Sequence, residues 1–177
     1  MSNGTLFLTR RQLIVGSSVL GALALSACST TTVLSPAGEG DVRDMTEAAL
    51  PLVNALRAKR GLPKLSADRN AAQAARDHAA RMSQYGKMSH YVGNDRSFLE
   101  RMKRQGVELP AAENIAAGQD TVEAAVQAWI DSRKHLENML GPYRGLGVAV
   151  ARNDGTGRRP YWAMVLSNPD TGFGFRI

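Results

Sequence analysis

The pattern of apolar and polar positions predicts two long helices in the first half of the chain. Over residues 45–60, apolar side chains recur at helical spacing, at Leu50, Val53 and Leu56. Gly61 follows and is expected to cap the C-terminus of this helix. Ser66 is expected to cap the second helix, whose inward stripe consists of Ala71, Ala74, Ala75, His78, Ala79 and Met82. Because most of these side chains are small, we expect this helix to pack closely against its neighbour.

Two shorter helices are predicted next. One spans residues 97–105 and ends at Gly106. The other begins at residue 120 or 121 and continues to about residue 134. Asp120 and Glu123 resemble a capping box at its start.

After Pro142 the pattern changes from helix to strand. Apolar residues alternate with small ones at Leu146, Val148 and Val150, a turn sequence follows at 153–157, and residues 161–166 form an apolar run. This pattern predicts a β-hairpin. Several helices followed by a terminal antiparallel pair predict an α+β fold rather than a wound parallel sheet.

The N-terminal residues are typical of an export signal with a lipid attachment site. Residues 12–27 are uncharged and mostly apolar, and they follow Arg10 and Arg11. This run is too short for a comfortable transmembrane helix. Residues 25–28, Leu-Ser-Ala-Cys, resemble a bacterial lipobox, which predicts removal of residues 1–27 as a signal peptide and lipidation of Cys28. The alternative is a buried cysteine in an ordinary helix. Residues 9–14 also resemble a twin-arginine export signal.

A short tether and one domain are expected to follow. Residues 28–41 are small and polar and are broken by Pro36, Gly38 and Gly40, so we interpret them as a flexible tether. Residues 42–177 then form a single domain. The protein is expected to be exported and lipid-anchored in the cell envelope, with the membrane as its partner through Cys28. Ser29 resembles the residue found in lipoproteins sent to an outer membrane, which would place the domain in the periplasm.

Charge and cysteine content exclude some functions. The 177-residue chain has a net charge of +6, and removal of residues 1–27 leaves 20 basic and 16 acidic residues, or +4. The basic residues are scattered, aromatic residues are few and no glycine-rich phosphate loop is present, so no nucleic-acid binding is expected. Cys28 is the only cysteine, which excludes an intramolecular disulfide and a cysteine-based metal cluster.

The three histidines differ in their surroundings. His78 lies on the alanine stripe and is interpreted as a core histidine with a satisfied hydrogen bond and no chemical role. His90 follows the end of the second helix at Gly86, in a segment without helical periodicity, where functional residues often lie. His135 falls where the fourth helix is expected to end, so a capping role is an alternative to chemistry.

Glu113 is the most suggestive acid. It lies within residues 110–118, a run that contains no other charge, and a buried carboxylate needs a partner. An imidazole is a suitable partner, and two histidines with one or two carboxylates can bind zinc or exchange protons.

These residues belong to ordered blocks that together resemble the CAP superfamily, which includes cysteine-rich secretory, antigen five and pathogenesis-related proteins. The similarity runs from about residue 48 to 166. The blocks are Asn54 with Arg57, Gly61-Leu62-Pro63-Lys64-Leu65, Met88-Ser89-His90, Ala112-Glu113-Asn114-Ile115-Ala116, Ala128-Trp129, Ser132, His135, Asn138-Met139-Leu140 and Gly147-Val148. The resemblance implies an α-β-α sandwich with a central antiparallel sheet.

The resemblance also implies a cavity with two histidines and two acids. His90 matches the first histidine, Glu113 the first acid and His135 the second histidine. The second acid falls at or beside Ser132, so Asp131 is only a displaced fourth candidate. Members of the superfamily are linked to zinc, sterols, fatty acids, glycans or proteolysis, so the resemblance implies zinc as a candidate cofactor and a lipid, sterol-like or glycan molecule as a candidate ligand.

Three functions stay open. The sequence favours a non-enzymatic binding module for a small apolar ligand, an envelope component or a metal, because it contains no Ser/His/Asp or Cys/His pattern and no His-Glu-x-x-His helix. The second hypothesis is a zinc-dependent or acid/base hydrolase that uses His90, His135 and Glu113. The third is a structural or partner-binding lipoprotein. Trp129 and Trp162 are expected to pack in the core rather than to bind a ligand.

Overall fold

A computed structural model describes residues 40–94 and 97–169. The predicted signal peptide, Cys28 and nearly all of the expected tether lie outside these residues. Asp41, at the end of the expected tether, already pairs with Arg152 in a sheet. The elements are β1 (Asp41–Asp44), α1 (Thr46–Ala58), β2 (Ser66–Ala67), α2 (Arg69–Tyr85), α3 (Phe98–Arg104), β3 (Ala112–Ala117), α4 (Val122–Ile130), α5 (Arg133–Met139), β4 (Gly145–Arg152), a 3-10 turn (Asp154–Thr156) and β5 (Tyr161–Ser167). Among the described residues, no helix has the length and apolar character needed to span a bilayer.

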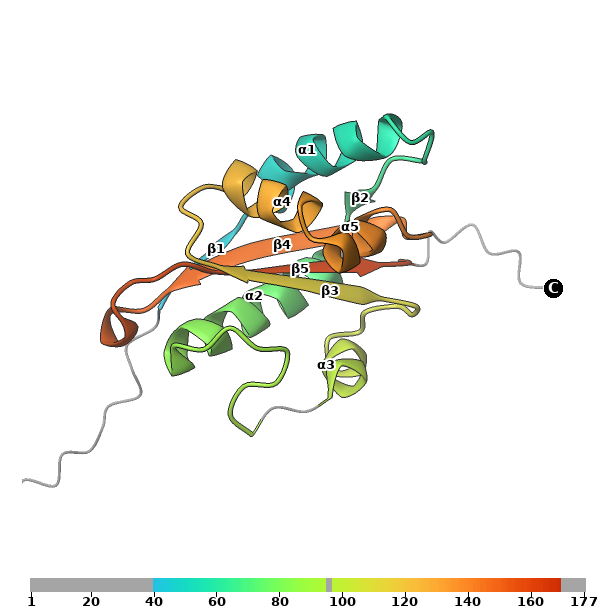
Figure 1. The fold of residues 1–177 in the computed structure, drawn as a ribbon. Coiled ribbons are helices and arrows are strands. Elements are labelled where there is room, and N and C mark those ends of the chain that lie inside the picture. The colour runs from blue at the N-terminus through green and yellow to red at the C-terminus, as the bar shows by residue number, and fades with distance from the viewer. Residues whose placement is uncertain (1–39, 95–96, 170–177) are drawn as a thin grey trace, which may run out of the picture. The chain divides into compact units, whose positions relative to one another are not determined.

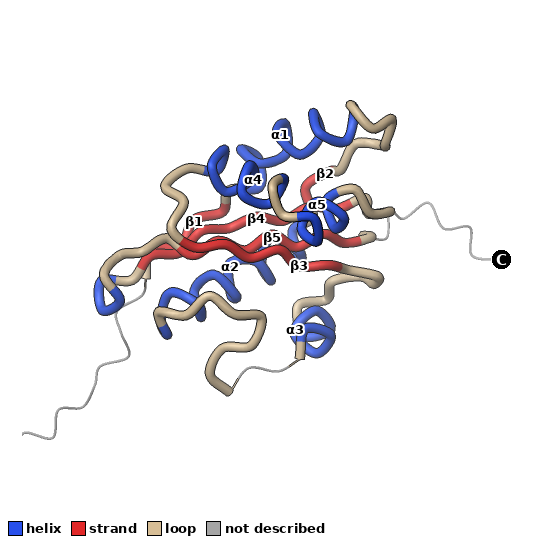
Figure 2. The backbone as a smooth tube through the Cα atoms, in the orientation of Figure 1, coloured by secondary structure: helices blue, strands red, loops and turns tan. Residues whose placement is uncertain are grey.

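The sheet has the strand order β1-β4-β5-β3, and these neighbours are antiparallel. The short strand β2 pairs in parallel with the beginning of β4. The central β4–β5 pair confirms the predicted hairpin. Helices α1, α4 and α5 cover one face of the sheet, and α2 and α3 cover the other (Figures 1 and 2). The α+β class and the α-β-α layers with a central antiparallel sheet are therefore confirmed.

The alternation along β4 explains how both faces are covered. Leu146, Val148 and Val150 belong to the core beneath α1 and α4, whereas Ala149 and Ala151 belong to the core beneath α2. Gly147 lies on the α2 side as well. A Cβ atom there would lie 2.1 Å from the backbone nitrogen of Ala72. The expected close packing of the alanine-rich helix is confirmed, and its partner is the sheet.

The ends of the first two helices differ from their predicted positions. Helix α1 ends at Ala58 with Lys59 as its C-cap, and Gly61, with a φ of +66°, follows two residues later. The predicted cap at Ser66 is wrong because this residue pairs with Gly145 in β2. Asp68 caps α2 instead, since its carboxylate accepts a hydrogen bond from the Asn70 amide at 2.9 Å.

The predicted fourth helix is two helices. Ser132 adopts an extended conformation, with φ −99° and ψ 115°, which separates α4 from α5. The start of α4 is capped by the Thr121 hydroxyl, which accepts from the Ala124 amide, so the expected capping box of Asp120 with Glu123 is wrong. His135 consequently lies inside α5 rather than at a helix C-terminus. The short helix expected over 97–105 is confirmed as α3, with Ser97 and Glu100 forming a capping box.

Asn54 and Arg57, two residues of α1 that resemble those of the superfamily, bind the loops next to this helix through hydrogen bonds. The Asn54 side chain donates to the Leu65 carbonyl at 3.0 Å and accepts from its amide at 2.8 Å. Arg57 is 2 % exposed, and its guanidinium donates to the backbone carbonyls of Pro63, Met139, Gly141 and Tyr143. Both side chains act structurally. Trp129 and Trp162 are each buried in the core, which confirms that expectation.

Candidate functional site

The site is organised around Glu113 on β3. Along this strand Ile115 joins the core beneath α2, whereas Ala116 joins the core beneath α4. Because side chains alternate along a strand, Glu113 points to the same face as Ile115. Asn114 points to the opposite face, toward α5. One strand therefore positions groups on both sides of the sheet.

The Glu113 carboxylate accepts hydrogen bonds through both oxygens, from the buried Arg101 and from His90. Arg101 binds it with two nitrogens, Nη1 to Oε2 at 2.8 Å and Nη2 to Oε1 at 2.9 Å. His90 Nδ1 donates to Oε1, also at 2.8 Å. Burial alone would raise the pKa of Glu113, but the bonds from His90 and Arg101 and the nearby charges of His78 and Arg101 lower it to about 2. Glu113 is therefore an ionised acceptor at every physiological pH.

His78 and Arg101, which both lie next to Glu113, were not among the predicted site residues. His78 is buried and its Nε2 atom lies 3.0 Å from the Ser89 carbonyl, which confirms the expected core histidine. The same atom lies 3.6 Å from Glu113 Oε1, so His78 also adds to the electrostatics of the site. Arg101 could have been detected from its place on α3 beside Met102 and one turn after Phe98, because a cation on an apolar helix face needs a buried counter-ion.

His90 lies in the loop after α2, as predicted, and its side chain is 47 % exposed. An ionised carboxylate can only accept, so the proton of a neutral His90 ring is on Nδ1, where it bonds to Glu113. The Nε2 atom then carries the lone pair. Glu113 thus fixes both the tautomer and the orientation of the ring.

The side chain of Asn114 on β3 connects the strand to α5, the helix that carries His135. The Asn114 side chain donates to the His135 carbonyl at 3.0 Å and accepts from Asn138 at 2.8 Å. Burial, and to a smaller degree the charge of His90, lowers the pKa of the His135 imidazole. The structure therefore brings His90 and His135 close enough to interact electrostatically, although they come from different layers of the fold.

A groove of about 220 Å³ has His135 in its lining. Since Ile115 and Ala116 both line it and face opposite sides of the sheet, the groove lies at the outer edge of β3. Its other walls come from Met88 in the loop before His90 and from the α4–α5 segment, namely Ala128, Trp129, Ser132 and His135.

The family comparison covers the segment that builds this site. The model of the cysteine-rich secretory protein family, CAP, matches residues 50–166. The chain belongs to the CAP family. The matched residues of the CAP domain include His90, Glu113 and His135, and they extend through both strands of the central hairpin.

Proteins similar to this CAP domain in sequence or fold occur in several bacteria. The uncharacterized protein YkwD of Bacillus subtilis is 33% identical over 134 residues, which is 75% of this chain and 51% of YkwD. An extracellular SCP-domain protein of Bacillus anthracis has a TM-score of 0.62 at 28% identity and is matched over 70% of this chain and 40% of its own. An outer surface protein of Borrelia burgdorferi has a TM-score of 0.63 at 19% identity, over 74% of this chain and 99% of its own. The chain thus spans about half of its curated relative YkwD.

The CAP-domain site lacks a compact set of metal ligands. No group of three or more His, Cys, Asp or Glu side chains within residues 40–94 and 97–169 is arranged to hold a metal ion. Glu113 is committed to Arg101 and His90, so a zinc ion at His90 and His135 would need further ligands. Asp131, the displaced fourth candidate, is exposed at the C-cap of α4 and accepts from Gln127 at 2.8 Å. The described residues therefore do not fit a complete zinc site.

Proposed function

We propose that this CAP domain is a binding module of the bacterial cell envelope, whose groove at the β3 edge holds a small, partly apolar ligand. The observation that carries the proposal is that the Glu113 carboxylate accepts hydrogen bonds from both Arg101 and His90. Its carboxylate stays ionised and orients His90, so it serves as a fixed part of the site rather than as a proton acceptor. His135 lines the groove, and so does Met88, two residues before His90.

The walls of the groove indicate the kind of ligand. Ile115, Ala116 and Ala128 give the groove apolar walls. Gln119 also lines it, and the amide oxygen of this side chain has no hydrogen-bond partner within the described residues. An amide oxygen accepts hydrogen bonds, so a ligand with a hydroxyl or amide donor suits it. The volume of about 220 Å³ is slightly below the usual range of small-molecule pockets and matches one ring or one headgroup.

The place of the protein in the envelope forms part of the same proposal. Relatives of this chain include an extracellular protein and an outer surface protein. The lipobox at residues 25–28 supports a lipid anchor at Cys28. We therefore propose that the ligand is an envelope component such as a glycan ring or a lipid headgroup, which a tethered domain meets at high local concentration.

A substitution that fills the groove tests this function. Ala128→Leu adds three carbon atoms to a lining residue without touching the polar cluster. Ala124→Leu is the matched control, because Ala124 lies one turn earlier on α4, is exposed and does not line the groove. We would titrate the full-length chain with a peptidoglycan disaccharide and with short-chain phosphatidylglycerol and follow chemical shifts. Binding that is lost in Ala128→Leu and kept in Ala124→Leu supports the proposal, whereas equal binding by all three proteins, or by none, contradicts it.

Acid/base hydrolysis is a second candidate, and the His90–Glu113 bond of 2.8 Å favours it. A carboxylate that orients a histidine through Nδ1 leaves Nε2 free to accept a proton. Hydrolysis of peptidoglycan by the wild-type chain that His90→Gln abolishes, with ligand binding retained, would support this candidate. The absence of turnover in both proteins would leave the binding module as the function.

A further inference from the structure

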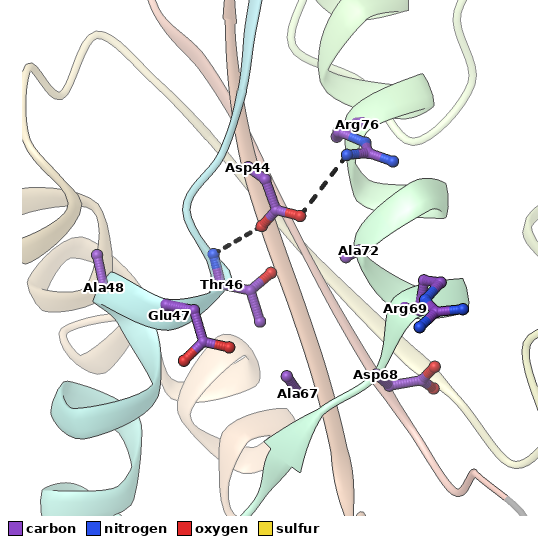
Figure 3. A pocket seen from close by; sticks show the side chains of 9 residues that line it. All are labelled: Asp44, Thr46, Glu47, Ala48, Ala67, Asp68, Arg69, Ala72 and Arg76. Atoms are coloured by element: carbon purple, nitrogen blue, oxygen red, sulfur yellow. Dashed lines mark hydrogen bonds and ion pairs between the residues drawn. The ribbon is translucent and has the colours of Figure 1, made fainter.

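A second cavity lies at the opposite edge of the sheet from the groove. Strands β1 and β2 both pair with β4, β1 with Ala149–Arg152 and β2 with Gly145 and Leu146. Helix α1 begins after β1 and α2 begins after β2, so the first turns of both helices face the gap between the two strands. This gap is a cavity of about 580 Å³ (Figure 3).

Several charged side chains around this cavity already have structural partners. Asp44 accepts from the Thr46 amide at 2.9 Å and pairs with Arg76 at 3.8 Å. Asp68 caps α2 through one oxygen and accepts from the Ser167 hydroxyl at 2.6 Å through the other. These three side chains therefore define the walls and are not free to bind a ligand.

Two opposite charges remain. Glu47, in the first turn of α1, and Arg69, the first residue of α2, lie on different walls of the cavity (Figure 3). Both are exposed, and neither takes part in a hydrogen bond or ion pair with another described residue. They also do not pair with each other in Figure 3. Within the part of the chain that the structure describes, the cavity thus presents one anion and one cation without partners on separate walls.

We propose that this cavity binds a zwitterion with an ammonium and a carboxylate group, either a free amino acid or a short peptide. The carboxylate would lie on Arg69, whose guanidinium suits bidentate recognition, and the ammonium would lie on Glu47. The lining carries three acidic and two basic residues. The positive ends of two helix dipoles bring this balance close to neutral. A balanced field of this kind favours a ligand with both charges over a polyanion or a polycation, and the volume lies within the range of small-molecule pockets.

The test uses a matched set of ligands and residue-resolved detection. The full-length chain in detergent micelles would be titrated with tri-alanine, with tri-alanine blocked at its N-terminus, with tri-alanine blocked at its C-terminus, and with glycine. Backbone amide shifts report which residues respond. Ligand concentrations up to about 10 mM keep even a millimolar complex mostly bound.

Glu47→Gln and Arg69→Gln remove the two charges in turn. Their controls occupy equivalent helix positions elsewhere: Glu123→Gln in the first turn of α4 and Arg133→Gln at the first residue of α5. We expect shifts at residues 46–48 and 69–72. Each of the two cavity variants, and each blocked peptide, should bind roughly three- to fivefold more weakly, the effect of one exposed ion pair. The control variants should bind like the wild-type chain.

The two ligand sources give different results. Tighter binding of tri-alanine than of glycine identifies a peptide, and the reverse identifies a free amino acid; either supports the site. The proposal is overturned if no ligand shifts residues 46–48 and 69–72, if the blocked peptides bind as well as the unblocked one, or if the cavity variants bind like their controls.

Discussion

Arg101 and Glu113 form a buried ion pair in which each partner compensates the other. Both side chains are nearly fully buried, with exposures of 4% and 2%. Removal of one partner leaves the other charge buried without compensation, which costs about 3–5 kcal/mol. We therefore expect Arg101→Met to lower the free energy of unfolding by this amount in urea denaturation.

The double variant Arg101→Met with Glu113→Gln separates charge from packing. It removes both charges and should recover most of the lost stability, because replacement of a whole buried pair is often close to neutral. Arg104→Met is the control, since Arg104 is exposed on the same helix. An Arg101→Met variant as stable as Arg104→Met would show that the pair contributes nothing.

Glu113 should also make stability depend on pH in the acid range. Its pKa is about 2 in the folded chain against an ordinary value of 4.5, so the unfolded chain binds more protons between these values. The stabilisation is complete above pH 4.5 and is lost as the pH falls toward 2. It totals roughly 3 kcal/mol, of which about 2 kcal/mol is lost by about pH 3.

Other carboxylates titrate in the same pH range, so the effect of Glu113 has to be measured as a difference between two proteins. Unfolding free energies of the wild-type chain and the Arg101→Met, Glu113→Gln double variant would be compared at about pH 6 and pH 3. The free energy of unfolding of the wild-type chain, relative to that of the double variant, should fall by about 2 kcal/mol at the lower pH. The same difference at both pH values would show that the partners of Glu113 do not lower its pKa.

At the residue scale, the sequence predicted three site residues but not Arg101, which binds the Glu113 carboxylate. His90, Glu113 and His135 stand in recognisable blocks; His90 and Glu113 share a hydrogen bond, and His135 lines the groove. Arg101 belongs to no such block, and only the packing of α3 against β3 reveals its role. Asp131 was a displaced candidate, and the break between α4 and α5 leaves it exposed.

At the element scale, Gly147 sets the distance between α2 and the sheet. A Cβ atom there would lie 2.1 Å from Ala72 N and 2.2 Å from Ala71 C, and helix backbone cannot yield as a side-chain tip can. Gly147→Ala should therefore displace α2 and destabilise the fold by about 3 kcal/mol or more. Gly155→Ala, at the exposed turn, should cost far less in the same thermal unfolding measurement, since only the Asn153 side-chain oxygen approaches it, at 3.1 Å. Equal losses for both variants would contradict close packing at Gly147.

Periodic elements were predictable, and short or interrupted ones were not. Helices α1, α2 and α3 and the central hairpin follow clear apolar patterns. Strand β3 was not predicted because Glu113 and Asn114 are both buried, so the strand shows no alternation of apolar and polar residues. The short β2 forms only because it pairs with β4. The break between α4 and α5 depends on one extended residue, Ser132, and no local sequence pattern indicates it.

At the scale of the domain, the two proposed sites occupy opposite edges of one sheet. The groove lies at β3, and the charged cavity lies between β1 and β2. The α+β class of the fold was predictable from the order of the elements. The separation of the sites was not, because it depends on the strand order β1-β4-β5-β3, which joins strands that are distant in sequence.

At the scale of the whole chain, Cys28 is the proposed point of attachment to a membrane. Cys28 is the only cysteine, so the chain offers a single thiol for lipid attachment. Each buried methylene adds about 0.8 kcal/mol to membrane binding, and several acyl chains together give firm retention. We expect the chain, expressed with an alkyne-tagged fatty acid in a bacterium that exports lipoproteins, to become labelled and to begin at residue 28 by mass spectrometry.

Cys28→Ser should abolish this label, whereas Ser35→Ala, within the expected tether, should leave it unchanged. Labelling separates lipid attachment from simple retention of residues 1–27, which would also hold the chain at a membrane through its apolar run. An unlabelled wild-type chain, or a labelled Cys28→Ser variant, would remove the anchor from the proposal. The groove would then have to meet its ligand by free diffusion, and the high local concentration argued for an envelope component would no longer apply.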